Sequence, residues 1–167
     1  FGVDPACSFF VTHKLAPLEA KDMNGRTALY YAVWQKRDGC WRILLDAGAS
    51  PNCTDINGVS ILHLAAWTQN SSCVRSLLER GADPRSQCAG QRYTALHLAV
   101  RSGDAKTVAL LAKTGVALDW KDQSGFTPLD YAIHIGSRKC AAELIKAGAS
   151  LCVVYYYVNI REWLGHQ

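Results

Sequence analysis

A short motif that returns at an almost fixed spacing constrains this chain more than any other feature. The motif recurs at intervals of 33, 34 and 33 residues, as Thr27-Ala28-Leu29, Ser60-Ile61-Leu62, Thr94-Ala95-Leu96 and Thr127-Pro128-Leu129. A period of that length predicts a stacked array, in which each unit buries its apolar side against its neighbours. Such an array leaves one long surface open, which favours a role in binding another protein.

The same period governs further positions that indicate two helices in each unit. An alanine and then a glycine follow each motif in phase, at Ala32, Ala65, Ala99 and Ala132, and at Gly48, Gly81, Gly115 and Gly148. Paired apolar residues such as Leu44 and Leu45, with Trp41 three residues earlier, have the spacing of one buried helix face. Thr or Ser can cap a first helix, and the glycine can end a second one.

A tight reversal separates successive units. It is written as Asp22-Met23-Asn24-Gly25, Asp55-Ile56-Asn57-Gly58 and Asp122-Gln123-Ser124-Gly125. Asp and Asn side chains bond their own backbone in turns, and Gly accepts a positive φ. The predicted unit is therefore turn, helix, turn, helix.

Taken together, these residues resemble the ankyrin repeat. The matching segments include Asn24-Gly25-Arg26-Thr27-Ala28-Leu29, Leu62-His63-Leu64-Ala65-Ala66, Leu96-His97-Leu98-Ala99, Gly125-Phe126-Thr127-Pro128-Leu129 and Gly81-Ala82-Asp83-Pro84. The resemblance covers about Asp22 to Val154. It implies an all-α ankyrin repeat solenoid with β-hairpin turns, comprising four full repeats and partial or capping elements at both ends.

The period also sets the expected boundaries. We expect ankyrin repeats at residues 22–54, 55–88, 89–121 and 122–154, with a longer hairpin assigned to 55–88 because one extra residue precedes Thr94. Residues 1–21 are predicted to be a degenerate or truncated N-terminal repeat or cap, in which about Phe9 to Glu19 aligns with a second helix and its turn. Residues 155–167 are predicted to form a C-terminal capping helix, with a strand as the alternative. Because the chain begins with Phe1, we expect a monomeric fragment of a longer protein.

Two units depart from the family pattern at a position with a structural role. Tyr30 and Asp130 stand where the other units have His63 and His97. In the ankyrin family this histidine ties neighbouring hairpins together by hydrogen bonds. The link is therefore open to question in two of the four units.

Composition argues against several classes of function. The chain is 49% apolar without a hydrophobic run near ~18 residues, so we expect ample core and no membrane span. The net charge of +4 comes from 18 scattered basic residues, which argues against nucleic-acid binding. Among the seven cysteines, Cys40, Cys73 and Cys140 share one repeated helix position and are predicted to be core residues. So many thiols without a metal-binding spacing favour a reducing, intracellular location, either cytoplasmic or nuclear.

No motif for catalysis or for a cofactor is found. The chain has neither a phosphate-binding glycine loop nor a nucleophile motif. His134 and Asp130 lie four residues apart on one predicted helix face, but a nucleophile or metal to act with them is lacking. The sequence therefore predicts that the protein is not an enzyme and binds no metal or cofactor.

The positions that vary while the frame repeats are the candidates for binding a partner. Trp34, Trp67, Arg101 and His134 follow two residues after the repeated alanines, where the ankyrin resemblance implies a place on the concave groove. With their neighbours and the hairpin residues, the candidate set is Met23, Arg26, Trp34, Gln35, Ile56, Val59, Trp67, Arg92, Tyr93, Arg101, Phe126 and His134. The expected partner is a protein or peptide with hydrophobic and acidic side chains.

Alternatives remain open at this stage. Trp34 and Trp67 either cover neighbouring helices or serve as binding anchors, and we favour anchors because aliphatic residues would suffice for packing. The two rings could instead form walls of a methyl-lysine cage, as in a histone-tail reader, although no acidic side chain is expected beside them. The array could also be the substrate-receptor or scaffold arm of a larger signalling or ubiquitin-ligase protein.

Overall fold

The computed structural model describes residues 5–13 and 17–150. Its helices are α1 (Pro5–Thr12), α2 (Ala28–Trp34), α3 (Asp38–Asp46), α4 (Ile61–Trp67), α5 (Ser71–Glu79), α6 (Ala95–Ser102), α7 (Ala105–Ala112), α8 (Pro128–His134) and α9 (Arg138–Lys146). Within these ranges the hairpins form no strand, and a single isolated antiparallel bridge joins Thr54 to Ser60. The capping helix expected at 155–167 lies outside the described residues.

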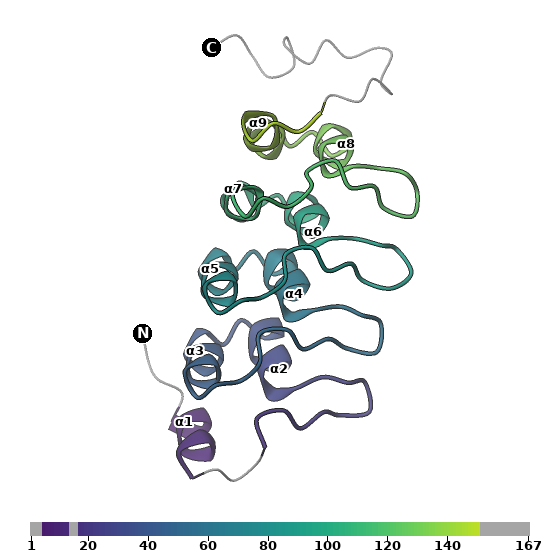
Figure 1. Cartoon of the computed structure of the whole chain (residues 1–167). Coiled ribbons are helices and arrows are strands. Elements are labelled where there is room, and N and C mark those ends of the chain that lie inside the picture. Colours follow the sequence, from purple (N-terminus) through teal and green to yellow (C-terminus); the bar gives the residue numbers. More distant parts are fainter. Residues whose placement is uncertain (1–4, 14–16, 151–167) are drawn as a thin grey trace.

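The helices stack in two columns, which confirms the all-α solenoid predicted from the period. The inner column holds α2, α4, α6 and α8, and the outer column holds α3, α5, α7 and α9, with α1 packed next to α3 (Figure 1). The hairpins project from the inner column on the side away from the outer one (Figure 1). Helices α3, α5, α7 and α9 each pair with the inner helix that precedes them in the chain.

Each inner helix begins at the capping residue that the sequence marks. The hydroxyls of Thr27, Ser60, Thr94 and Thr127 accept the backbone N–H three residues ahead, at 3.3, 3.3, 3.4 and 3.2 Å. Pro128 occupies the first turn of α8, where its missing N–H leaves no bond unmade. The predicted helix starts are therefore confirmed.

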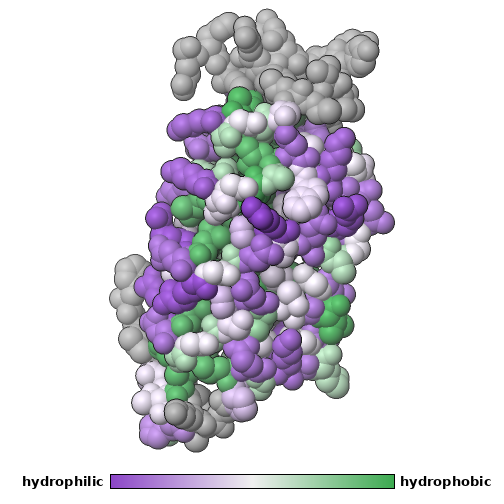
Figure 2. Space-filling view, in the orientation of Figure 1, coloured by the Kyte–Doolittle hydropathy of each residue, from purple (hydrophilic) through white to green (hydrophobic). Residues whose placement is uncertain are grey.

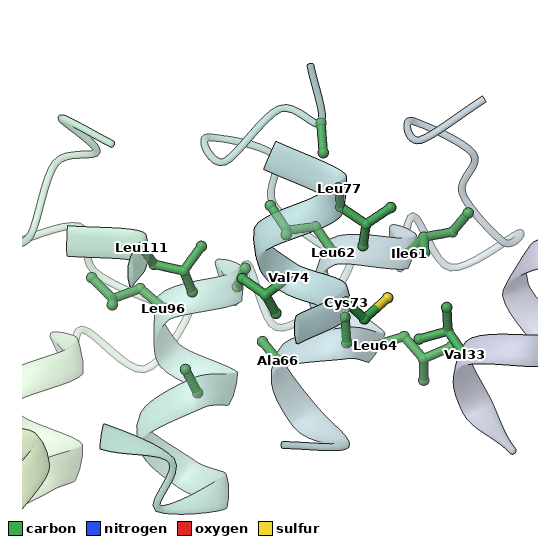
Figure 3. Packing of buried hydrophobic residues seen from close by; sticks show 14 of the residues in the cluster. Val33, Ile61, Leu62, Leu64, Ala66, Cys73, Val74, Leu77, Leu96 and Leu111 are labelled. Atoms are coloured by element: carbon green, nitrogen blue, oxygen red, sulfur yellow. The ribbon is translucent and has the colours of Figure 1, made fainter. Parts of the chain in front are cut away.

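The core runs through the whole stack, both between the two helices of each repeat and between successive repeats. The leucines of the repeated motif and the second-helix aliphatics are at most 5% exposed: Leu29, Leu62, Leu96, Leu129, Leu44, Leu77, Leu111 and Leu144. Val33 of α2 faces Leu64 of α4 across a repeat boundary (Figure 3). Cys73 and Cys140 are fully buried, as predicted, and Thr107 fills the same position in its repeat. Cys40, also predicted to be a core residue, is only half-buried against the core, because the first described helix covers it less completely than a full repeat would. Each buried leucine contributes about 2 kcal/mol.

Backbone hydrogen bonds tie each hairpin to the next. The amide N–H groups of Ile56, Ala89 and Gln123 donate to the carbonyls of Asn24, Asn57 and Gln91, at 2.9, 2.8 and 3.0 Å. The third hairpin closes through Cys88 N–H to Tyr93 O, whereas the first closes through Asp22 N–H to Arg26 O. The extra residue before Thr94 is thus accommodated in the turn without breaking the link.

Side chains add a second set of links between hairpins. His63 Nε2 donates to Tyr93 O at 2.9 Å and His97 Nε2 to Phe126 O at 3.2 Å, while each Nδ1 accepts the N–H of the capping residue. Tyr30 preserves the link with different chemistry, because its hydroxyl donates to Asp55 Oδ2 at 3.3 Å. Asp130 instead accepts the backbone N–H and hydroxyl of Thr127, both at 2.8 Å, so its bonds are local.

The N-terminal segment keeps the repeat phase but starts its helix earlier than predicted. The alignment placed a second helix from about Phe9, whereas α1 begins at Pro5, a residue suited to the first turn. Glu19 accepts the Ser50 N–H at 2.8 Å, as Asn52 accepts that of Asp83 and Asp119 that of Ser150 in later repeats. The predicted partial repeat therefore contributes a second helix at Pro5–Thr12 and the turn around Glu19.

Gly58→Ala is expected to destabilise the protein more than the matched variant Gly103→Ala. The two glycines have φ of +70° and +78°, so alanine costs about 1 kcal/mol at either position. At Gly58 an added Cβ would also lie 3.0 Å from the Ala89 backbone nitrogen, whereas at Gly103 nothing lies within 4 Å. We expect a total loss of about 2–3 kcal/mol for Gly58→Ala in urea unfolding. Equal losses would show that the hairpin link contributes little.

Stability is expected to fall as the pH drops below about 6.5, the ordinary pKa of histidine. Burial lowers the pKa of His63 and of His97, so the native state holds both rings neutral. The unfolded chain takes up these protons first, and stability present above its pKa is lost as the pH falls toward the lower native values. Urea unfolding across this range should be less pH-dependent for His97→Gln than for the wild type. His134→Gln, at an exposed position, is the control and should behave as the wild type.

Candidate functional site

The variable positions gather on one surface, which we call the inner face: the C-terminal ends of α2, α4, α6 and α8 and the hairpins that precede these helices. Trp34 and Trp67, at the same position of successive repeats, are 48% and 49% exposed. Arg101 and His134, which follow in the same series, are exposed as well. In these helices the repeated leucines and alanines are buried, whereas the residues that vary from repeat to repeat are exposed to solvent.

The first cluster on the inner face, which we call the N-terminal cluster, comprises Arg26, Tyr30, Tyr31 and Trp34. Arg26 reaches from its hairpin so that Cζ lies 5.0 Å from the Trp34 ring centroid and 5.6 Å from that of Tyr30. Tyr31 stacks on Trp34 with centroids 6.2 Å apart and ring planes 13° apart. The hairpin and the end of α2 thus contribute to one surface, with the arginine lying over aromatic rings.

The second cluster, which we call the central cluster, comprises Trp67, Tyr93, Arg101 and Tyr131. Arg101 Cζ lies 4.9 Å from the Tyr93 ring centroid, 5.7 Å from that of Tyr131 and 5.8 Å from that of Trp67. The three rings come from α4, from the third hairpin and from α8, while Arg101 belongs to α6. Phe126 borders the cluster, with its ring 5.7 Å from that of Tyr131. One arginine thereby joins residues of three successive repeats.

A hairpin aspartate accepts a hydrogen bond from one tyrosine of each cluster. The hydroxyls of Tyr31 and Tyr131 donate to Asp22 and Asp122 respectively, each at 2.7 Å. Hydrogen bonds from the Arg26 backbone N–H and the Tyr31 hydroxyl lower the pKa of Asp22. Burial opposes ionisation of Asp122, but the Tyr131 hydroxyl and two backbone N–H groups outweigh it and lower the pKa. Both carboxylates are therefore charged and already hydrogen-bonded.

The other predicted residues lie outside these two clusters. Met23 and Ile56 are 98% and 67% exposed on their hairpins, and Figure 2 shows apolar surface along the hairpin edge in the lower half of the array. Gln35 is exposed at the end of α2, and Val59 is half-buried in the second hairpin. Arg92 donates from Nε to Gln87 at 3.4 Å. Arg92 therefore lies apart from Arg101 in the contacts of the described residues.

His134 and Asp130, which share one face of α8 in the sequence, do not interact in the structure. Asp130 is 8% exposed and binds Thr127, whereas His134 is exposed at the end of α8. In the part of the chain that the structure describes, no group of three His, Cys, Asp or Glu side chains could hold a metal ion. None of the helices in these ranges is long and apolar enough to cross a membrane.

Tyr31 and Tyr131 belong to the clusters but are not among the residues predicted from the sequence. They occupy the same repeat position, where the two intervening repeats have Leu64 and Leu98. A tyrosine at a position that is leucine in the neighbouring repeats was a usable signal, because the hydroxyl has to find a partner at or near the surface. The repeat period also pairs each tyrosine with a possible acceptor for its hydrogen bond, since Asp22 and Asp122 share one repeat position as well.

Comparisons with known proteins establish the family. A family model described as ankyrin repeats (3 copies) matches residues 62–154, and a second, described as ankyrin repeats (many copies), matches residues 35–75. The chain therefore belongs to the ankyrin repeat family. Ankyrin repeats are protein-interaction modules and are generally non-catalytic.

The chain is also similar to part of a much longer curated protein. It is 42% identical over 59 residues to the E3 ubiquitin-protein ligase KEG of Arabidopsis thaliana. The match covers 35% of this chain and 4% of the ligase. The likeness is therefore confined to a short stretch of that relative.

Arg101→Ala is expected to leave the fold intact and to lower the free energy of unfolding by no more than about 2 kcal/mol. The arginine is exposed and its contacts with the three rings are individually worth about 0.5–1 kcal/mol. Arg92→Ala, which removes an exposed arginine outside the clusters, is the matched control and should change stability less. Urea unfolding measures both, and loss of folding in Arg101→Ala would show that the central cluster is part of the structural frame.

Proposed function

We propose that the protein is a non-catalytic interaction module that binds a peptide segment or a protein surface on its concave inner face, through aromatic and basic side chains. The observation that carries this proposal is the pair of half-exposed tryptophans at one position of successive repeats, each beside an arginine. Exposed Trp and Arg dominate the energetics of protein interfaces. The proposed partner presents hydrophobic side chains to the tryptophans and acidic ones to the arginines.

Trp34 and Trp67 were expected either to pack on neighbouring residues or to anchor a partner, and the proposal uses both roles. Trp34 packs on Tyr30 and Tyr31, with ring centroids 6.2 Å away in each case, so part of its surface supports the N-terminal cluster. About half of each tryptophan nevertheless stays open to solvent. That remainder would be covered by a partner, and truncation of such a residue often costs about 2 kcal/mol or more of binding energy.

The arginines argue against the methyl-lysine cage. A cage needs aromatic faces that are open to the incoming cation. Arg26 lies over Trp34 and Arg101 lies near Trp67, so a methylated lysine would meet a like charge beside each ring. The binding of an acidic and hydrophobic segment is therefore the better account of the same residues.

A second proposal concerns the larger context of the array. The similarity to a short part of an E3 ubiquitin-protein ligase supports a role as the substrate-receptor or scaffold arm of a larger signalling or ubiquitin-ligase protein. In that role the inner face would select the protein on which the rest of the molecule acts. An intracellular location accords with the buried thiols of Cys73, Cys88 and Cys140.

Trp34→Ala and Trp67→Ala are each expected to weaken binding about 30-fold, which corresponds to about 2 kcal/mol. Random 12-residue peptides displayed on phage would be selected on the 167-residue chain, and the dissociation constants of synthetic versions would be measured for each variant. The matched control is Trp120→Ala, which removes an exposed tryptophan that belongs to neither cluster. If both folded variants bind the selected peptides as tightly as the wild type does, the inner face is not the binding surface.

A further inference from the structure

We infer that Arg26 and Arg101 are two separate carboxylate-binding positions, and that the partner segment carries two acidic side chains about five or six residues apart with an apolar residue between them. This inference rests on the proposed function and specifies its partner. The apolar residue would contact Trp67, which lies between the two arginines in the order of the repeats.

The aromatic rings position each guanidinium without supplying a negative charge to pair with it. Arg101 lies within 6 Å of three ring centroids, and Arg26 of two. A guanidinium that lies over a ring keeps N–H donors at its edges available for a planar, two-oxygen acceptor. The Nε of Arg26 is buried, so at this position the donors are the two terminal amino groups. Within residues 5–13 and 17–150, no carboxylate forms an ion pair with either arginine, whereas Arg80 pairs with Asp46.

The hairpin carboxylates Asp22 and Asp122 are already hydrogen-bonded to other groups. Asp22 accepts the backbone N–H groups of Asn24 and Arg26 on one oxygen and the Tyr31 hydroxyl on the other. Asp122 does the same with Ser124, Phe126 and Tyr131. Freeing either carboxylate for an arginine would break a hairpin turn. Among the described residues, neither guanidinium therefore has a free carboxylate to pair with, and we assign the acidic groups to the partner.

The two arginine positions are separated by two helix layers. The Arg26 guanidinium lies at the end of α2 and Arg101 lies at the end of α6, with α4 between these helices (Figure 1). Packed helices are about 8–10 Å apart, so two layers span about 16–20 Å. An extended peptide advances about 3.3 Å per residue, and therefore crosses that span in about five or six residues.

Carboxylates fit these positions better than phosphates do. A phosphorylated residue carries nearly two negative charges and is usually bound by a cluster of arginines. Arg26 and Arg101 are two repeats apart, and Arg92 is directed to Gln87, so each position offers a single guanidinium. One planar guanidinium matches one carboxylate with two parallel hydrogen bonds. The occupant is thus a peptide segment with Asp or Glu at both positions.

The test uses synthetic versions of the phage-selected 12-residue peptides and the 167-residue chain. We expect selected peptides to share two acidic residues with the stated spacing, and we expect Glu→Gln (or Asp→Asn) at either one to weaken binding about tenfold or more. In double-mutant cycles, Arg101→Ala should make one of these substitutions neutral and Arg26→Ala the other. Arg101→Lys should recover only part of the affinity, because lysine keeps the charge but not the planar fork. Arg75→Ala, on the exposed side of α5, should bind as the wild type does.

The possible failures are distinct. Peptides that depend on Trp34 and Trp67 but show no coupling between an acidic residue and Arg26 or Arg101 would overturn this inference and leave the proposed function standing. A preference of tenfold or more for phosphoserine over glutamate would also overturn it. Selected peptides whose binding is unchanged by alanine at Trp34, Trp67, Arg26 and Arg101 would count against both proposals. The absence of any selected peptide would do the same.

Discussion

The packing of each inner helix against the next is the contact on which the rest of the structure depends. A single repeat has helices too short to bury their own apolar faces, so its leucines become buried only when neighbouring repeats cover them. The fully buried Ala65, Ala66 and Ala99 allow α4 and α6 to approach closely. This close stacking places the hairpins next to one another and brings side chains of neighbouring repeats within reach.

The hairpins show that one structural requirement can be met by different side chains. The backbone link is the same at each of the three described junctions, but the side-chain link uses Tyr30 at the first and histidine at the next two. Burial, reinforced by the Asp55 charge, raises the pKa of Tyr30, so its hydroxyl remains a hydrogen-bond donor. The departure from the family residue therefore changes the chemistry of the link without removing it.

The inner face combines a rigid frame with side chains that differ from repeat to repeat. The rings of Tyr30 and Tyr131 lie beside Arg26 and Arg101, and their hydroxyls donate to the hairpin aspartates Asp55 and Asp122. Each arginine is therefore positioned by a ring that is itself held in place. Such preorganisation lowers the conformational entropy lost when a partner binds. The tryptophans and the arginines, which the sequence predicts as separate candidates, belong to the same two clusters.

The sequence by itself determined the solenoid, the helix starts at Thr27, Ser60, Thr94 and Thr127, and the buried series of leucines and alanines, because each depends on local spacing and on the repeat period. It also identified most of the exposed positions, since these interrupt the period. The grouping of Arg101 with Trp67, Tyr93 and Tyr131, the role of Tyr30 and the start of α1 at Pro5 were decided only by the tertiary structure. The physical reason is that long side chains reach across repeat boundaries, and their partners are set by the spacing and orientation of the stacked layers rather than by neighbours in the sequence.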